Sequence, residues 1–270
     1  MPRLCIFCRK PLVKRSVEHI LPQWMWPVLG LGSGTGLTNV HKRRVPGGES
    51  QLTYLVIKNY PTTSANGFVE GRVCTKCNTG WMSQLESKVI PILSPLTERP
   101  NASAIENLSK SDQELLSLWA VKTALVLIRS KVIARNVSDE HYDEVFKGRT
   151  PRGIGVFAGF HLHNQGFSWT VDRNWSAHCP RAQEQNVLNT LHEKSYKVCL
   201  QLGALLLLIA YPPPPHLFLG YVTGLHRPLW SERPIFERPE QVQFIGLSPD
   251  DSRRLFGDLL HIAWMPEPYT

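Results

Sequence analysis

The sequence predicts an α+β protein built from two parts that differ in composition and pattern. Of its 270 residues, 42% are hydrophobic, which suffices for a sizeable core and for one large or two small domains. Residues 1–99 hold two close pairs of cysteines, whereas residues 109–270 alternate between helical and strand-like patterns. We therefore expect an N-terminal domain over 1–99 with a long insertion, followed by a C-terminal α+β domain over 109–270.

The hydropathy of the chain favours a cytoplasmic protein with no membrane partner. Its most apolar run, residues 203–211, is far shorter than the roughly 20 residues that a membrane-spanning helix needs. The N-terminus also lacks the basic and apolar pattern of a secretory leader. In a reducing compartment, cysteine pairs favour metal binding over disulfides.

Four of the six cysteines form two CxxC pairs, Cys5–Cys8 and Cys74–Cys77. Two such pairs can complete one tetrahedral Zn²⁺ shell, and a shell of four thiolates has no open position, so its role would be structural. The 65 residues between the pairs would then form a long loop closed by the metal. A redox dithiol or a chance pairing is the alternative. Cys179 and Cys199 stand alone and suit small core positions.

The excess positive charge lies entirely in the first part of the chain. Residues 1–100 contain 13 Lys and Arg against 5 Asp and Glu, whereas residues 101–270 contain 17 of each. A basic segment suits a polyanion such as nucleic acid, and a solvated basic surface is the equal alternative. The candidate phosphate contacts are Lys42, Arg43, Arg44 and Arg72.

The periodicity of the chain indicates its main elements. In the first part we expect a flexible loop over 29–37, a strand over 52–60 and a linker over 94–108. A capping box at 111–114 predicts the start of an apolar-rich helix that runs from about 113 to 134. Further on we expect a hairpin of 153–163 with 167–172, one long strand over 196–211, and a last helix from Ser248.

The stretch SVEHILPQW, residues 16–24, lies between the cysteine pairs and places Glu18 and His19 at the end of a short β-prone run. Adjacent strand residues point to opposite faces, so a shared site requires the chain to bend there. A neutral His19 can accept a proton from water near neutral pH. The carboxylate of Glu18 and the amide oxygen of Asn78, directly after the second pair, suit a hard cation such as Mg²⁺ or Mn²⁺. Asn78 could also cap the helix that follows.

The order Cys5-x-x-Cys8, Glu18-His19, Cys74-x-x-Cys77-Asn78 resembles the HNH nucleases of the ββα-metal superfamily, particularly the zinc-containing branch that includes phage junction-resolving endonucleases. The resemblance covers about residues 4–93. It implies a zinc-stapled ββα-metal domain in which Glu18 and Asn78 hold one divalent cation and His19 activates water.

Three positions depart from the family pattern. Many members have Asp where this chain has Glu18, and the final His is Asn78. No asparagine stands at short spacing before the second cysteine pair; Asn66 is more distant, so the middle position stays unassigned.

The sequence therefore predicts a metal-dependent HNH-type endonuclease that hydrolyses phosphodiester bonds in DNA. Its catalytic residues would be His19, Glu18 and Asn78, with a structural Zn²⁺ and a catalytic Mg²⁺ or Mn²⁺ as cofactors. The alternative is a non-catalytic zinc-stabilised nucleic-acid-binding module, which would require neither Glu18 nor His19. The choice between DNA and RNA, the role of the C-terminal domain and assembly into a homo-oligomer stay open.

Overall fold

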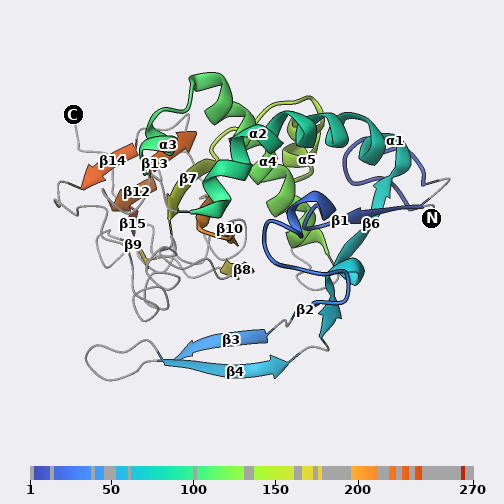
Figure 1. The fold of residues 1–270 in the computed structure, drawn as a ribbon, viewed down its shortest axis with the longest axis horizontal. Coiled ribbons are helices and arrows are strands. Elements are labelled where there is room, and N and C mark those ends of the chain that lie inside the picture. The colour runs from blue at the N-terminus through green and yellow to red at the C-terminus, as the bar shows by residue number, and fades with distance from the viewer. Residues whose placement is uncertain are drawn as a thin grey trace.

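The computed structural model describes residues 3–12, 15–37, 40–45, 53–59, 62–99, 102–130, 137–160, 166–172, 176–177, 196–211, 219–222, 227–230, 235–238 and 263–264. These ranges mix helices and strands, which confirms the predicted α+β class (Figure 1). No helix in these ranges is long and apolar enough to span a membrane.

Two short strands frame the N-terminal region. β1 (Arg15–His19) pairs antiparallel with β6 (Val69–Cys74), and a bulge lies between Ser16 and Glu18. The segment between them contains η1 (Gln23–Met25), β2 (Gly36–Leu37), β3 (Val40–Val45), β4 (Thr53–Asn59), β5 (Thr63–Ser64) and η2 (Ala65–Gly67). β6 leads directly into the second cysteine pair.

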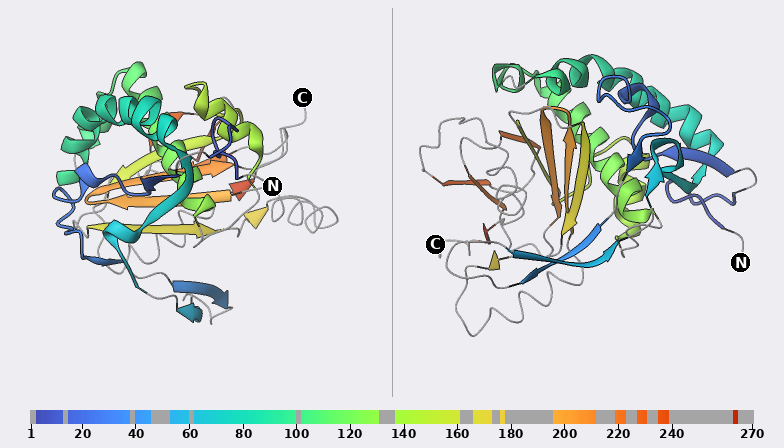
Figure 2. Two further views of the ribbon diagram at one scale, coloured as in Figure 1. Left: turned by 90° about the vertical axis from the view of Figure 1, so that its right-hand side faces the viewer. Right: turned by 60° about the horizontal axis from the view of Figure 1, so that its bottom comes forward.

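β3 and β4 form a two-stranded ribbon that extends away from the rest of the molecule (Figures 1 and 2). β2 pairs with β5 at its base, and β3 pairs with β4 beyond it, both antiparallel. The strand expected over 52–60 is thus present as β4. The basic run at 42–44 lies within strand β3. Only the backbone of these two strands is described.

Helical segments follow from the second cysteine pair onward, and the chain kinks at Gly80. They are α1 (Thr75–Cys77), the π-helical turn η3 (Asn78–Met82), α2 (Ser83–Glu98) and α3 (Ala102–Glu106). The linker expected over 94–108 is therefore mostly helical, and that expectation is wrong. α2 continues past two prolines because Leu93 and Leu96 are fully buried, and this packing outweighs the local cost of proline.

The longest helix among the described residues is α4 (Lys110–Arg129), which packs against α2 and β6. Its cap is Ser109, two residues before the start of the predicted capping box, and the Ser109 Oγ accepts from the backbone N–H of Asp112 at 3.1 Å. Side chains are buried almost continuously from Leu116 to Ile128. A shorter helix, α5 (Asp139–Phe146), follows.

A five-stranded antiparallel sheet forms the centre of the second half, in the order β13 (Arg227–Trp230), β7 (Gly155–Phe160), β11 (Leu205–Tyr211), β10 (Tyr196–Leu202), β8 (Phe167–Asp172). α2 and α4 lie on one side of it (Figure 2). Two small pairs complete the described strands: β9 (Ser176–Ala177) with β15 (Ala263–Trp264), and β12 (Leu219–Val222) with β14 (Ile235–Arg238).

Two predictions about this sheet are wrong. The run 196–211 is a hairpin and not one strand, because Gly203 adopts φ +60° in a turn between β10 and β11. β7 and β8 do not pair with each other, because the β10–β11 hairpin lies between them. That hairpin is rich in leucine and buried, so it takes the centre of the sheet. The helix expected from Ser248 and the position of Cys179 lie outside the described residues.

One hydrophobic core joins the two halves of the chain. Cys5, Val89, Leu125 and Leu207 are each 0% exposed and belong to one continuous cluster that runs from the first cysteine pair to the sheet. The N-terminal residues therefore pack on α4 and share a core with the C-terminal sheet.

Candidate metal centre and neighbouring side chains

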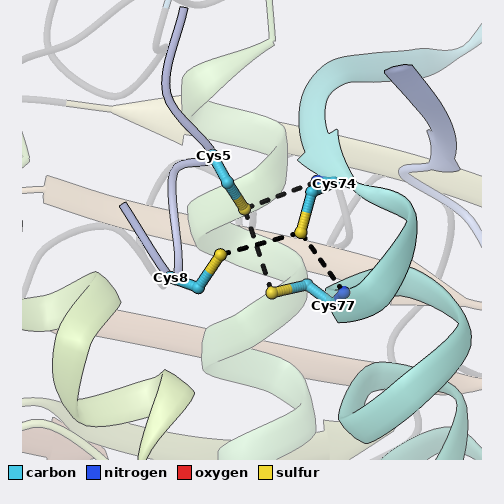
Figure 3. Close-up of side chains that lie close together, drawn as sticks. All are labelled: Cys5, Cys8, Cys74 and Cys77. Carbon is cyan, nitrogen blue, oxygen red and sulfur yellow. Dashed lines mark hydrogen bonds between the residues drawn. The ribbon is translucent and has the colours of Figure 1, made fainter. Parts of the chain in front are cut away.

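The four cysteines of the two CxxC pairs lie together where β6 meets α1 (Figure 3). All four sulfurs lie within 4.8 Å of one another. The Cys8 and Cys74 sulfurs are 3.6 Å apart, and those of Cys5 and Cys77 are 3.9 Å apart. A tetrahedral site with Zn–S bonds of about 2.3 Å has sulfur separations of about 3.8 Å, whereas a disulfide bond measures about 2.05 Å. The cluster could therefore hold a metal such as zinc.

Backbone geometry places these sulfurs. The N–H of Cys74 donates to the Cys5 sulfur and the N–H of Cys77 donates to the Cys74 sulfur, both at 3.4 Å. Arg9, directly after Cys8, adopts φ +58°, the left-handed conformation that turns the chain out of the first pair. The Arg9 guanidinium reaches Asp139 at 2.8 Å and Asp143 at 3.4 Å, so α5 supports this turn.

Burial opposes the ionisation of the clustered thiols. Burial raises the pKa of Cys77 and of Cys8. Burial acts in the same direction on Cys5, but backbone hydrogen bonds from Cys8 and Cys74 outweigh it and lower the pKa of the Cys5 thiol. Four adjacent thiolates need a compensating charge, which a divalent metal supplies.

His19 lies at the end of β1 beside Asn66. Its Nε2 is 3.3 Å from Oδ1 of Asn66 and 3.3 Å from Nε2 of Gln23, and its ring meets the edge of Trp26 at 5.5 Å between centroids. One ring nitrogen cannot donate to an amide oxygen and accept from an amide nitrogen at once. An Nε2–H that donates to Asn66 resolves this when the Gln23 amide presents its oxygen. Nδ1 then keeps its lone pair.

Asn66 is the residue that sequence spacing did not assign. It lies on η2, which Ser64 caps by accepting from the N–H of Gly67 at 3.1 Å. β5 and η2 together return the chain from the ribbon to β1. The only sequence signal for this contact is the turn-forming run Ser-Ala-Asn-Gly at 64–67.

Asn78 connects the helix to β1. Its amide nitrogen donates to Oγ of Ser16 at 2.6 Å and to the carbonyl of Val17 at 3.2 Å. Asn78 is not the N-cap of the helix, because the helix begins at Thr75 and the sulfur of Cys74 accepts from the N–H of Cys77. The cap interpretation of Asn78 is therefore wrong.

Glu18 points into the protein toward α4. It is 4% exposed, and its Oε1 accepts from Nζ of Lys122 at 3.2 Å. The same Nζ donates to Oε1 of Glu86 at 2.8 Å. Burial raises the pKa of Glu18, and the charge of Lys122 opposes it. Burial disfavours the ammonium as well, but the two carboxylates outweigh it and raise the pKa of Lys122.

The donor set expected for a catalytic cation is not assembled in this arrangement. Glu18 accepts from a buried ammonium, and Asn78 is held by its amide nitrogen against Ser16 and Val17. These two residues do not fit a divalent cation as they stand. Within the described residues, the four cysteines form the only group of three or more His, Cys, Asp or Glu side chains placed to bind a metal.

The expected phosphate contacts differ in their surroundings. The guanidinium of Arg72 donates to Glu70 at 3.3 Å and to the carbonyl of Arg129 at 3.1 Å, so it is engaged within the protein. Lys42, Arg43 and Arg44 occupy consecutive positions of β3, opposite β4, and their side chains lie outside the described part.

A cavity of about 320 Å³ lies elsewhere, between α5 and β11. Its lining residues are Glu140, His141, Glu144, Pro151, Arg152, Gly153 and Tyr211. His141 Nδ1 lies 2.9 Å from the hydroxyl of Tyr196, and burial lowers the pKa of His141 to about 4. No sequence motif marks this cavity.

No protein-family model, curated protein or solved structure matches this chain. Its function is therefore inferred from its own side chains and their contacts.

Proposed function

We propose that this protein is a metal-dependent endonuclease of the HNH type that hydrolyses phosphodiester bonds in DNA with His19 as the general base. The observation that carries this proposal is the contact between His19 and Asn66 at 3.3 Å. It supports an imidazole whose Nε2 carries the proton and whose Nδ1 is basic, which is what proton abstraction from water requires.

The cysteine cluster supports the proposal through its position. It lies between the end of β6 and the start of α1, and Asn78 follows it and bonds to β1, the strand that carries His19. Zinc held by four thiolates would fix this strand–helix junction and would take no part in the reaction, because it has no open position. Proton transfer at His19 is a separate task.

The ribbon supports DNA as the substrate. A two-stranded β-ribbon fits the major groove of DNA, and β3 carries three consecutive basic residues at 42–44. The chain leaves and re-enters the ribbon at the β2–β5 pair, and η2 with Asn66 follows at once. DNA held along the ribbon would therefore be bound beside His19.

One observation favours the second candidate, a zinc-stabilised nucleic-acid-binding module without catalysis. Glu18, the carboxylate expected to bind a catalytic cation, is buried in an ion pair with Lys122. A module that only binds DNA needs the ribbon and the zinc but no free carboxylate at this position.

Supercoiled plasmid distinguishes the two candidates. The native protein should nick or linearise it with Mg²⁺ or Mn²⁺ and not with EDTA. His19→Ala should lower the rate at least about 100-fold, since a general base contributes about 10²- to 10⁴-fold, and His161→Ala serves as the control. DNA affinity measured in EDTA should be equal in all three proteins. Binding by the native protein without cleavage, or full activity of His19→Ala, would favour the binding module.

A further inference from the structure

Three charged side chains from three distant segments meet inside the protein. Glu18 belongs to β1, Glu86 to α2 and Lys122 to α4. Nζ of Lys122 lies 2.8 Å from Glu86 and 3.2 Å from Glu18. The side chain of Lys122 is 1% exposed, that of Glu86 is 20% exposed and that of Glu18 is 6% exposed. The ammonium is thus enclosed between two carboxylates.

This ammonium lies between two carboxylates, the kind of group that also binds divalent cations. Two carboxylate oxygens converge on one positive centre, and together the three groups carry one net negative charge. A second cation on Glu18 would lie a few ångströms from the ammonium, in surroundings where charges are poorly screened. Lys122 and a divalent cation therefore compete for the same carboxylate.

The competition matters because Glu18 adjoins His19. A carboxylate turned toward α4 is not available to a cation on the side of Asn78, whose amide nitrogen is bound to Ser16. Lys122 lies on α4, beyond the N-terminal region. The availability of Glu18 to a cation therefore depends on a residue of the second half of the chain.

We propose that Lys122 is an internal cation that occupies the Glu18–Glu86 carboxylate pair and withholds Glu18 from divalent cations. Loss of the ammonium exposes two carboxylates that bind a divalent cation in its place. Only the catalytic consequence rests on the proposed function: in the nuclease, Lys122 sets the concentration of divalent cation at which Glu18 becomes a ligand.

Thermal unfolding with added Mn²⁺ tests this. Lys122→Ala should melt below the native protein without Mn²⁺, because the buried carboxylate of Glu18 and the partly buried carboxylate of Glu86 lose their counter-charge. Added Mn²⁺ should restore its melting temperature, with half of the effect at a concentration at least about tenfold lower than any effect on the native protein. Lys122→Arg keeps a cation and should respond as the native protein does. Equal Mn²⁺ responses of Lys122→Ala and the native protein would overturn the proposal.

A second pair of variants covers the case in which Lys122→Ala does not fold. Lys122→Met with Glu86→Gln leaves Glu18 as the one carboxylate of the cluster, and adding Glu18→Gln removes it. Mn²⁺ should stabilise the double variant and not the triple variant; the absence of any difference would overturn the proposal.

The outcome is independent of whether the proposed function is correct. If the native protein does not cleave DNA but Mn²⁺ stabilises Lys122→Ala, the nuclease proposal fails and the proposed role of Lys122 stands. Cleavage by the native protein with no Mn²⁺ gain in the variants would do the reverse.

Discussion

The side-chain oxygen of Asn66 lies 3.3 Å from Nε2 of His19, although 47 residues separate the two along the chain. The ribbon lies between them in the sequence, and the β2–β5 pair with η2 brings Asn66 beside His19. When the Gln23 amide presents its oxygen to His19, the Asn66 contact places the proton on Nε2 and leaves Nδ1 as the basic nitrogen.

Asn66→Ala should release the imidazole from this tautomer. We expect ¹⁵N NMR of the His19 ring to show one tautomer in the native protein and a mixture in the variant. Loss of such an orienting contact typically costs about 10- to 100-fold, so cleavage should fall by that amount if His19 is the base. The melting temperature should change little, because Asn66 is exposed. Asn66→Asp keeps an acceptor and is the control; an unchanged tautomer ratio in Asn66→Ala would refute the role of this contact.

The sulfur geometry predicts one Zn²⁺ per chain. Cys74→Ser should lose the metal and destabilise the start of the helix, because the Cys74 sulfur is both a ligand candidate and the acceptor for the N–H of Cys77. Cys199→Ala is the matched control, since Cys199 is buried in β10 away from the cluster. Elemental analysis of the freshly purified proteins measures the difference, and native protein without zinc would contradict the prediction.

Arg9 should tolerate glycine better than alanine. A side chain in the left-handed conformation costs about 1–2 kcal/mol, and the exposed ion pairs of Arg9 with α5 contribute at most about 1 kcal/mol. Arg9→Gly loses the ion pairs but relieves the backbone, whereas Arg9→Ala loses the ion pairs and keeps the cost. We expect urea unfolding to show Arg9→Gly more stable than Arg9→Ala by about 1 kcal/mol. Equal stabilities would mean that φ +58° costs nothing here.

Stability should fall on acidification through His141. Burial lowers the pKa of His141 from the usual 6.5 to about 4, so between these values the unfolded chain takes up a proton that the folded protein does not. The contribution of neutral His141 to the free energy of unfolding is therefore fully present above pH 6.5. It is lost as the pH falls toward 4, by at most about 3 kcal/mol. His141→Phe should show a shallower pH dependence in urea unfolding. Parallel curves for His141→Phe and the native protein would contradict this.

The basic run of β3 should dominate the salt dependence of DNA binding. Each phosphate contact contributes about 0.9 to the slope of log K against log salt, so replacing Lys42, Arg43 and Arg44 by Gln should make the slope shallower by about 2.7. The control replaces Lys147, Arg149 and Arg152, three basic residues of the electrically neutral second half. Fluorescence anisotropy with a DNA duplex measures both slopes. Equal slopes in the two triple variants would place the DNA elsewhere.

Local patterns in the sequence determined the parts of this protein that depend on neighbouring residues. A CxxC pair brings two sulfurs together by itself, and two such pairs complete one tetrahedral shell, so the cysteine pattern predicted the four-cysteine cluster although 65 residues separate the pairs. Alternating β-branched and aromatic residues marked β4, and a capping residue with an apolar repeat marked α4 to within two or three residues of its start. Residues 196–211 form an almost unbroken apolar run because both strands of the β10–β11 hairpin are buried. The turn at Gly203 therefore does not interrupt the hydropathy pattern.

Only the tertiary structure decided which distant residues meet. Glu18 and Lys122 lie 104 residues apart, so the local sequence around Glu18 does not identify Lys122 as its ion-pair partner. The strand order likewise follows from the burial of the β10–β11 hairpin at the centre of the sheet, which separates β7 from β8. Such contacts depend on how whole segments pack, because a buried charge needs a partner wherever the fold can supply one. The residue types of the site were therefore set by the sequence, and their partners were set by the fold.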